Sequence, residues 1–317
     1  MRVPEELIAL IRKNRDFILA THTSPDGDAL GSSLALSSAL ESLGKITAVF
    51  NRDGVPEIYR FLPGRERVAS LLPRDKGLLV LLDCNEPERA GLGDASFPYS
   101  IVIDHHETVR DFGDIRWIEP HAASTGMMVY YLLKELGVRI TGDVATNLYA
   151  AIAVDTGTMR YGNTTSEVLR VCAELVDSGA DPGSISSALY EAWSYGRFRL
   201  LLSVLNTLEV VGDIAMTYVT KEMFSQTGTS PEDTEHFSSF PRMMKDIRVS
   251  AFFRQTDDGW KVSLRSRGDA DVARIAEQFR GGGHKNAAGY RTKGDLKTAH
   301  EILIGKLRDE TFATKAL

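Results

Sequence analysis

The chain has 317 residues, which is too long for one ordinary domain and suits two. Its composition, 43% hydrophobic and 25% charged, is that of a globular protein, and its apolar runs are shorter than the roughly 20 residues of a membrane-spanning helix. Acidic residues near the start argue against a secretory signal, and the two cysteines, Cys84 and Cys172, form neither a disulfide framework nor a cysteine zinc site. We therefore expect a cytoplasmic protein without membrane contact.

The charge is unevenly distributed along the sequence. The net charge of −6 argues against a protein whose surface is broadly basic and binds long duplex nucleic acid. The segment 242–292 carries 11 Lys and Arg against 6 Asp and Glu, so it is +5 and the remainder of the chain is −11. The acidic part would suit metal ions and the basic part an anionic substrate. A solvated basic face explains the basic segment equally well.

The first half of the chain alternates apolar strands with helical segments. Continuous apolar runs of this kind are typical of strands that are covered on both faces of a parallel sheet. Helical spacing with a Gly44 stop predicts the first helix after the opening strand, and Ser124 or Thr125 would cap the second. We expect strands at 16–22, 45–51, 77–83 and 99–104, and helices at 29–44, 124–137 and 143–157.

The second half begins with a mostly helical stretch at 164–210, which is interrupted at 178–184, and the residue pattern then changes from helical to strand-like. Beyond it, alternating polar and apolar residues predict strands, and 271–283 reads as a helix that runs into glycines. The expected strands are 214–220, 248–255 and 259–267. We predict a metal-binding domain at 1–185, a helical linker at 186–212 and a substrate-binding domain at 213–317.

Three predicted strands end on a side chain that could bind a metal: His22, Asp83 and Asp104. Ligands gather at the carboxyl ends of the strands in open α/β sheets, so these residues should converge in space. One buried strand that ends in Asp is commonplace, because Asp also begins turns. Three such endings, joined by Asp26 and Asp28 in a PDGD turn, are hard to explain as turns alone.

The second cluster follows Asp104 directly, as His105 and His106, and Asp155 closes a further apolar run. Consecutive side chains point in different directions, so we expect one His at a metal and the other at a substrate oxygen or in proton transfer. Carboxylates and imidazoles with almost no thiol favour Mn²⁺ or Mg²⁺ over structural zinc. The set is large enough for two ions that share a carboxylate, an arrangement suited to displacement at phosphorus.

Four segments stand in order along the chain: HTSPDGDALGS, LLDCN, VIDHH and AVDTGTMRYGNT. They resemble the four motifs of the DHH phosphoesterase superfamily, and the later SLRSRG and IAEQFRGGGHKNAAG segments resemble its DHHA1 domain. Within the superfamily the chain looks most like the NrnA-type oligoribonucleases. Those enzymes degrade RNA oligomers of a few nucleotides, and many remove the 3′-phosphate of pAp (adenosine 3′,5′-bisphosphate).

The resemblance implies an α/β fold in which a parallel-sheet DHH domain is joined by helices to a smaller α/β DHHA1 domain. It implies a metal-dependent phosphodiesterase that hydrolyses short single-stranded oligoribonucleotides to mononucleotides and acts on nucleotide phosphates such as pAp, in a cleft between the domains. The cofactor would be two Mn²⁺ ions per site, with Mg²⁺ or Co²⁺ as substitutes. A homodimer is compatible with the same resemblance.

The resemblance also assigns residues to roles. One metal would take His22, Asp26 and Asp83, and the other Asp28, Asp83, His105 and Asp155, so that Asp83 bridges them and a water between the ions is the nucleophile. Asp104 would orient the His pair, and His106 would face the scissile phosphate. The phosphate-binding set of the second domain would be Arg265, Arg267, Gly281, Gly282, Gly283 and His284.

Two details of that set stay open. Arg265 and Arg267 alternate with Ser266 in a predicted strand, so both lie on one face, and Arg265 is the closer match to the family position. Arg280 stands where many relatives have a further glycine, so it either changes the loop or adds a phosphate contact. A glycine run alone is most often only a loop.

Two other functions are compatible with these motifs. A cyclic di-AMP or linear dinucleotide phosphodiesterase would use the same metals and glycine run. A non-catalytic nucleotide-binding regulator belongs to a different class, and it would have no need of a complete bimetallic ligand set.

Overall fold

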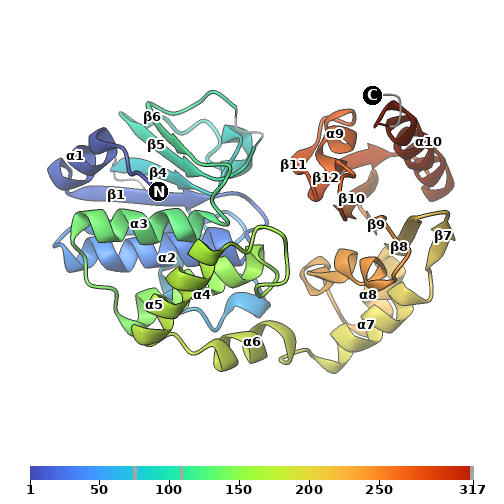
Figure 1. Ribbon diagram of the computed structural model, residues 1–317, viewed down its shortest axis with the longest axis horizontal. Helices are drawn as coiled ribbons and strands as arrows, with labels where there is room; N and C mark the ends of the chain where they lie inside the picture. The colour runs from blue at the N-terminus through green and yellow to red at the C-terminus, as the bar shows by residue number, and fades with distance from the viewer. Residues whose placement is uncertain (74–76, 108–109, 315–317) are drawn as a thin grey trace. The chain divides into compact units, whose positions relative to one another are not determined.

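The computed structural model describes residues 1–73, 77–107 and 110–314, which fold into two compact units, Met1–Ala192 and Trp193–Leu317 (Figure 1). Each unit has its own sheet and its own buried core. Within the described ranges, no helix combines the length and the apolar character that crossing a bilayer demands.

The first unit is built on a six-stranded sheet in the order β3-β2-β1-β4-β5-β6. All neighbouring strands run parallel, which confirms the predicted parallel α/β fold. The central strands are buried almost throughout, as their continuous apolar sequences predict. The strands are β1 (Asp16–Thr21), β2 (Ile46–Phe50), β3 (Val68–Ala69), β4 (Leu78–Leu82), β5 (Ser100–Asp104) and β6 (Ile115–Ile118).

Helices cover one face of this sheet. Leu19, Val80 and Ile103 point to that face and share a core with α2 and α3, while α4 packs on those two helices (Figure 1). The opposite face, with Leu79 and Val102, is covered by short 3₁₀ segments and loops. The helices are α1 (Glu5–Lys13), α2 (Gly27–Ser42), α3 (Thr125–Leu136), α4 (Gly142–Asp155), α5 (Ser166–Asp177) and α6 (Pro182–Tyr190).

Helix α2 begins before the predicted residue 29. The side chain of Asp26 accepts hydrogen bonds from the backbone N–H groups of Asp28 and Ala29, both at 3.0 Å, so Asp26 is the N-cap.

Strand β6 was missed in the sequence analysis, because its four residues are too few for a recognisable pattern. The segment pairs with β5 through the backbone and buries Trp117.

The second unit has a six-stranded sheet in the order β11-β12-β10-β9-β8-β7. Strands β8 and β9 are parallel and the other pairs antiparallel, so this sheet is mixed. The three strands predicted here are confirmed to within about one residue at either end. The strands are β7 (Glu209–Val211), β8 (Ile214–Val219), β9 (Val249–Gln255), β10 (Gly259–Ser266), β11 (Gly282–His284) and β12 (Ala287–Lys293).

The helices of this unit cover both faces of its sheet. Helices α9 and α10 share a core with Val262 and Leu264, and α7 shares the opposite core with Phe252. The helix that was predicted to run into the glycines is confirmed as α9, but it ends at Glu277, and Gly282 and Gly283 pair with β12 as part of a strand. The helices are α7 (Tyr195–Leu205), α8 (Lys221–Thr227), α9 (Val272–Glu277) and α10 (Leu296–Thr314).

Candidate active site

The site of the first unit lies where three neighbouring strands end. Strands β1, β4 and β5 are adjacent and parallel, so their carboxyl ends lie at one edge of the sheet. His22 follows β1, Asp83 follows β4, and Asp104 is the last residue of β5. The predicted strand-end residues are thus brought to one place by the sheet topology.

The first group consists of His22, Asp26 and Asp83. The Nε2 atom of His22 lies 3.4 Å from Oδ2 of Asp83 and 3.9 Å from Oδ2 of Asp26. The Nδ1 atom of the same ring lies 2.9 Å from the backbone oxygen of Thr23. The neutral ring therefore carries its hydrogen on Nδ1, and its Nε2 lone pair faces the carboxylates.

The second group is built around His105. Its Nε2 atom lies 3.0 Å from Oδ2 of Asp155, 3.6 Å from Oδ2 of Asp28 and 3.6 Å from Oδ1 of Asp83. Its Nδ1 atom lies 3.1 Å from the backbone oxygen of Ala122, so here too the Nε2 lone pair points at carboxylates. Asp83 takes part in both groups, with one oxygen toward each.

Asp83 has an unusual backbone conformation for a residue with a side chain. Its φ is +54°, in the left-handed region, which Asp tolerates better than most residues. The backbone N–H of Asp83 still donates to Ile103 on β5, at 3.0 Å. The hydroxyl of Thr125 donates to Oδ1 of Asp83 at 3.3 Å. This local geometry turns the carboxylate toward both groups just as the strand ends.

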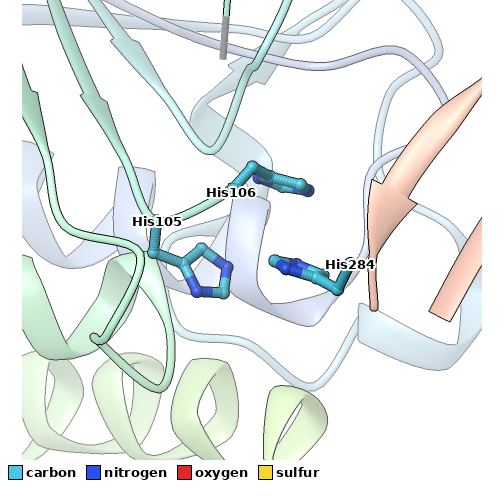
Figure 2. Close-up of side chains that lie close together, drawn as sticks. All are labelled: His105, His106 and His284. Atoms are coloured by element: carbon cyan, nitrogen blue, oxygen red, sulfur yellow. The ribbon is translucent and has the colours of Figure 1, made fainter. Parts of the chain in front are cut away.

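His106 has a different partner. Its Nδ1 atom lies 2.7 Å from Oδ1 of Asp104, which also accepts the backbone N–H of His106 at 3.0 Å. Figure 2 shows the His105 and His106 rings turned at an angle to each other. Their centroids are 5.2 Å apart, and their planes meet at 64°. Asp104 therefore holds His106, while the carbonyl of Ala122 holds the ring of His105.

Helix α3 supplies a contact that sequence reasoning missed. Asp28 is fully buried, and its two oxygens accept hydrogen bonds from the backbone N–H groups of Thr125 at 2.7 Å and Gly126 at 2.8 Å. These donors are the first residues of α3, where unpaired N–H groups favour a negative charge. The helix start after Ser124 was predicted, but its partner lies far away in the sequence.

Close packing of α2 on α4 brings the remaining carboxylate into place. A Cβ on Gly31 would lie 2.4 Å from the backbone oxygen of Asn147, and one on Gly27 would lie 2.5 Å from Cγ2 of Val154. The absence of side chains at these positions lets the start of α2 approach the end of α4. Asp155, the last residue of α4, thereby comes close to the second group. The small residues after the PDGD turn thus have a packing role.

Burial and crowding shift the ionisation of these side chains when no cation is bound. Burial, followed by the charge of Asp83, raises the pKa of Asp26 to about 6 and that of Asp28 well above its usual value. Burial opposes protonation of His22 and His105, but hydrogen bonds to Asp83 and Asp155 raise the pKa of both rings. Without a bound cation, the negative charges of these carboxylates repel one another, and protonation of the carboxyl and imidazole groups reduces this repulsion.

The donor set fits divalent cations. Among the described residues of the first unit, the side chains form three groups whose ligand atoms lie within 4.8 Å of one another, and Asp83 belongs to each: His22, Asp26 and Asp83; Asp28, Asp83 and His105; Asp83, Asp104 and His106. Imidazole lone pairs that face carboxylates repel them unless a proton or a metal cation lies between. Hard oxygen ligands with imidazole suit Mn²⁺ or Mg²⁺.

The predicted phosphate-binding residues belong to the second unit. Arg265 lies in β10, where Nη1 donates to the backbone oxygen of Leu264 at 3.0 Å, and Arg267 is exposed just past the strand end. Gly282, Gly283 and His284 form β11 and pair with β12. A Cβ on Gly281 would lie 2.2 Å from the oxygen of Gly289, and one on Gly283 would lie 2.4 Å from that of Ala287. These two glycines are therefore required by strand packing.

Comparison with known proteins agrees with both units. Residues 16–152 match the N-terminal domain of the DHH family, and residues 214–309 match the DHHA1 domain. The chain is 40% identical to the bifunctional oligoribonuclease and PAP phosphatase NrnA of Thermus thermophilus, over 92% of this chain and 89% of that protein. It is 28% identical to the protein of the same description from Bacillus subtilis, over 90% and 91% of the two chains. A crystal structure of an exopolyphosphatase-related protein from Bacteroides fragilis superposes with a TM-score of 0.88 at 29% identity, covering 98% and 97%.

Proposed function

Since the chain belongs to the DHH family and ends in a DHHA1 domain, we propose that it is a metal-dependent phosphodiesterase that hydrolyses short oligoribonucleotides to mononucleotides. The relatives described as oligoribonuclease and PAP phosphatase support this substrate class and a second activity, removal of the 3′-phosphate of pAp. The observation that carries the proposal is Asp83, whose two oxygens face two separate carboxylate–imidazole groups.

The metal-binding part of the proposal follows from this geometry. His22, Asp26 and Asp83 would hold one cation, and Asp28, Asp83, His105 and Asp155 the other. Divalent cations, when bound, neutralise phosphate charge and lower the pKa of water. The ligand types support Mn²⁺, with Mg²⁺ or Co²⁺ as substitutes.

His106 and Asp104 would act on the substrate side of this centre. Asp104 holds Nδ1 of His106, and we propose that the Nε2 atom contacts a phosphate oxygen or moves a proton. Asp104 is thus proposed as the positioning residue and His106 as the catalytic one.

The second unit would supply phosphate contacts. Arg265 and Arg267 each offer a guanidinium for bidentate binding of a phosphate. The Gly281–Gly283 run and His284 would add backbone and imidazole donors. We further propose a cytoplasmic enzyme and a homodimer, the latter to be tested by light scattering coupled to gel filtration.

The direct test is a mass-spectrometric time course with Mn²⁺. The substrates are di- to pentaribonucleotides, a long single-stranded RNA, pAp, cyclic di-AMP and pyrophosphate, with Asp83→Asn as the inactive control. We expect loss of the short RNAs to mononucleotides and of the 3′-phosphate of pAp, with the long strand spared. Loss of cyclic di-AMP while the short RNAs persist would instead identify a signalling phosphodiesterase. Binding of nucleotides without any turnover would identify a regulator.

A further inference from the structure

Arg89, which was not among the predicted site residues, is attached to the segments that follow His22 and Asp83. Arg89 belongs to a 3₁₀ segment, Pro87–Ala90, and its Nη1 atom donates to Oδ1 of Asn85 at 2.8 Å. Asn85 is only 3% exposed and follows Asp83 by two positions. The backbone oxygen of Arg89 accepts the N–H of Thr23 at 2.6 Å, and Thr23 follows His22. Arg89 is therefore fixed to the segments that leave two of the candidate metal ligands.

The charge of Arg89 is not neutralised locally. The acidic residues beside it, Glu86 and Glu88, pair with Arg110 at 3.4 and 3.3 Å. In the described ranges, no carboxylate lies within ion-pair distance of Arg89, and its side chain is held by a neutral amide instead. The guanidinium thus lies beside the segments that follow His22 and Asp83 and has no anionic partner among the described residues.

We propose that Arg89 binds a phosphate oxygen of the substrate beside the group formed by His22, Asp26 and Asp83, and that Asn85 positions its guanidinium. A guanidinium has five N–H donors, so the bond to Asn85 leaves donors for a bidentate phosphate contact. A half-buried cation that is held in place before the substrate arrives stabilises the charge that develops on phosphorus oxygens. The inference rests on the proposed phosphoesterase function.

The test compares Arg89→Ala, Arg89→Lys and Asn85→Ala with a matched control, Arg52→Ala. Arg52 is an exposed arginine whose side chain packs beside Gly91, so its removal takes the same charge from the same neighbourhood. We expect Arg89→Ala to lower kcat/KM for a diribonucleotide by about 100-fold. Arg89→Lys should recover only part of this loss, and added guanidinium should restore activity to Arg89→Ala. Asn85→Ala should cost about 10-fold, and Arg52→Ala less than about threefold.

Two binding measurements separate this inference from a structural role and from the proposed function. Mn²⁺ affinity and thermal stability should be unchanged in Arg89→Ala, whereas inorganic phosphate should bind the Mn²⁺-loaded variant about 10-fold more weakly than the wild type. If the wild type hydrolyses none of the substrates but binds phosphate through Arg89, the proposed function fails and this inference stands. If kcat/KM or phosphate affinity stays within about threefold of wild type in Arg89→Ala, or if Mn²⁺ binding is lost with it, the inference is overturned.

Discussion

The Nε2 atom of His105 lies 3.0 Å from Oδ2 of Asp155, and the same atom lies 3.6 Å from carboxylate oxygens of Asp28 and Asp83. His105 is buried, and its pKa is raised well above the usual value, chiefly by the hydrogen bond to Asp155 acting against burial. Without a cation, a proton satisfies this pair. A metal that binds here must therefore displace protons.

We predict that Mn²⁺ affinity rises with pH. The pKa of Asp26 is raised to about 6, and those of Asp28, His22 and His105 are also raised, so the protein at low pH holds protons that compete with the metal. Between about pH 6 and pH 8, the association constant should increase by up to about tenfold per pH unit for each proton displaced. Calorimetry in buffers of different ionisation enthalpy counts the protons released.

The control for this titration is His121→Gln, which removes an exposed histidine outside the three groups. This variant should keep the wild-type dependence on pH. His105→Gln should release fewer protons and bind Mn²⁺ more weakly. An affinity that is independent of pH over the same range would contradict the proposed ligand set.

Asp83→Asn should remove metal binding with little change in fold. Asn keeps the size of Asp and also tolerates the left-handed φ of +54° at this position, so the backbone should hold its shape. The carboxylate shared by all three groups is lost, and we expect Mn²⁺ affinity and kcat/KM to fall by about 100-fold or more. Calorimetry and the short-RNA assay measure both quantities, and Asp94→Asn, an exposed carboxylate, is the control. Full activity in Asp83→Asn would refute its bridging role.

The strand-end residues could be predicted because their signal is local. Each of the runs before His22, Asp83 and Asp104 is apolar and short, and it stops at a polar residue. Parallel topology then brings such endings to one edge of the sheet, whatever the rest of the chain does. The first sheet and the grouping of its ligands follow from this pattern.

Contacts that depend on distant partners could not be predicted in the same way. Asp28 is held by N–H groups of Thr125 and Gly126, and nothing near Asp28 in the sequence indicates these partners. Gly31 appears as one small residue among several, and its role depends on the backbone of Asn147 in another helix. The strands at Gly282–His284 and Ala287–Lys293 were missed because glycine and alanine carry little strand preference.

Gly31→Ala should destabilise the first unit. The added methyl group would lie 2.4 Å from the backbone oxygen of Asn147, so α2 and α4 must separate. Overpacking of this kind costs about 1–3 kcal/mol. Separation of the helices should also weaken Mn²⁺ binding, because Asp28 and Asp155 lie on these two helices. Urea unfolding and calorimetry provide the two measurements.

Gly305→Ala is the matched control for Gly31→Ala. Gly305 lies in α10, and a Cβ there would meet nothing within 4 Å. Alanine in an open helical position should stabilise the protein by about 0.5–1 kcal/mol. Similar effects of the two substitutions would show that α2 and α4 can rearrange at little cost.

Arg280, just after α9, has a backbone conformation that glycine adopts more easily than arginine does. Its φ is +59°, its N–H donates to Glu277 at 2.9 Å, and the N–H of Gly281 donates to Ala276 at 2.9 Å. These bonds form a Schellman motif in which Arg280 occupies the left-handed position that usually belongs to glycine. In the part of the chain that the structure describes, the exposed guanidinium has neither a hydrogen bond nor an ion pair.

Arg280→Gly should therefore stabilise the second unit by about 0.5–1 kcal/mol, because it relieves the left-handed strain of a residue with a side chain. Arg280→Ala removes the same charge but keeps the strain, so it should not stabilise. Comparing the two variants by urea unfolding separates conformation from charge. A rise in KM for short RNA that is equal in both variants would assign Arg280 a phosphate contact, whereas an unchanged KM would leave its side chain without a part in substrate binding.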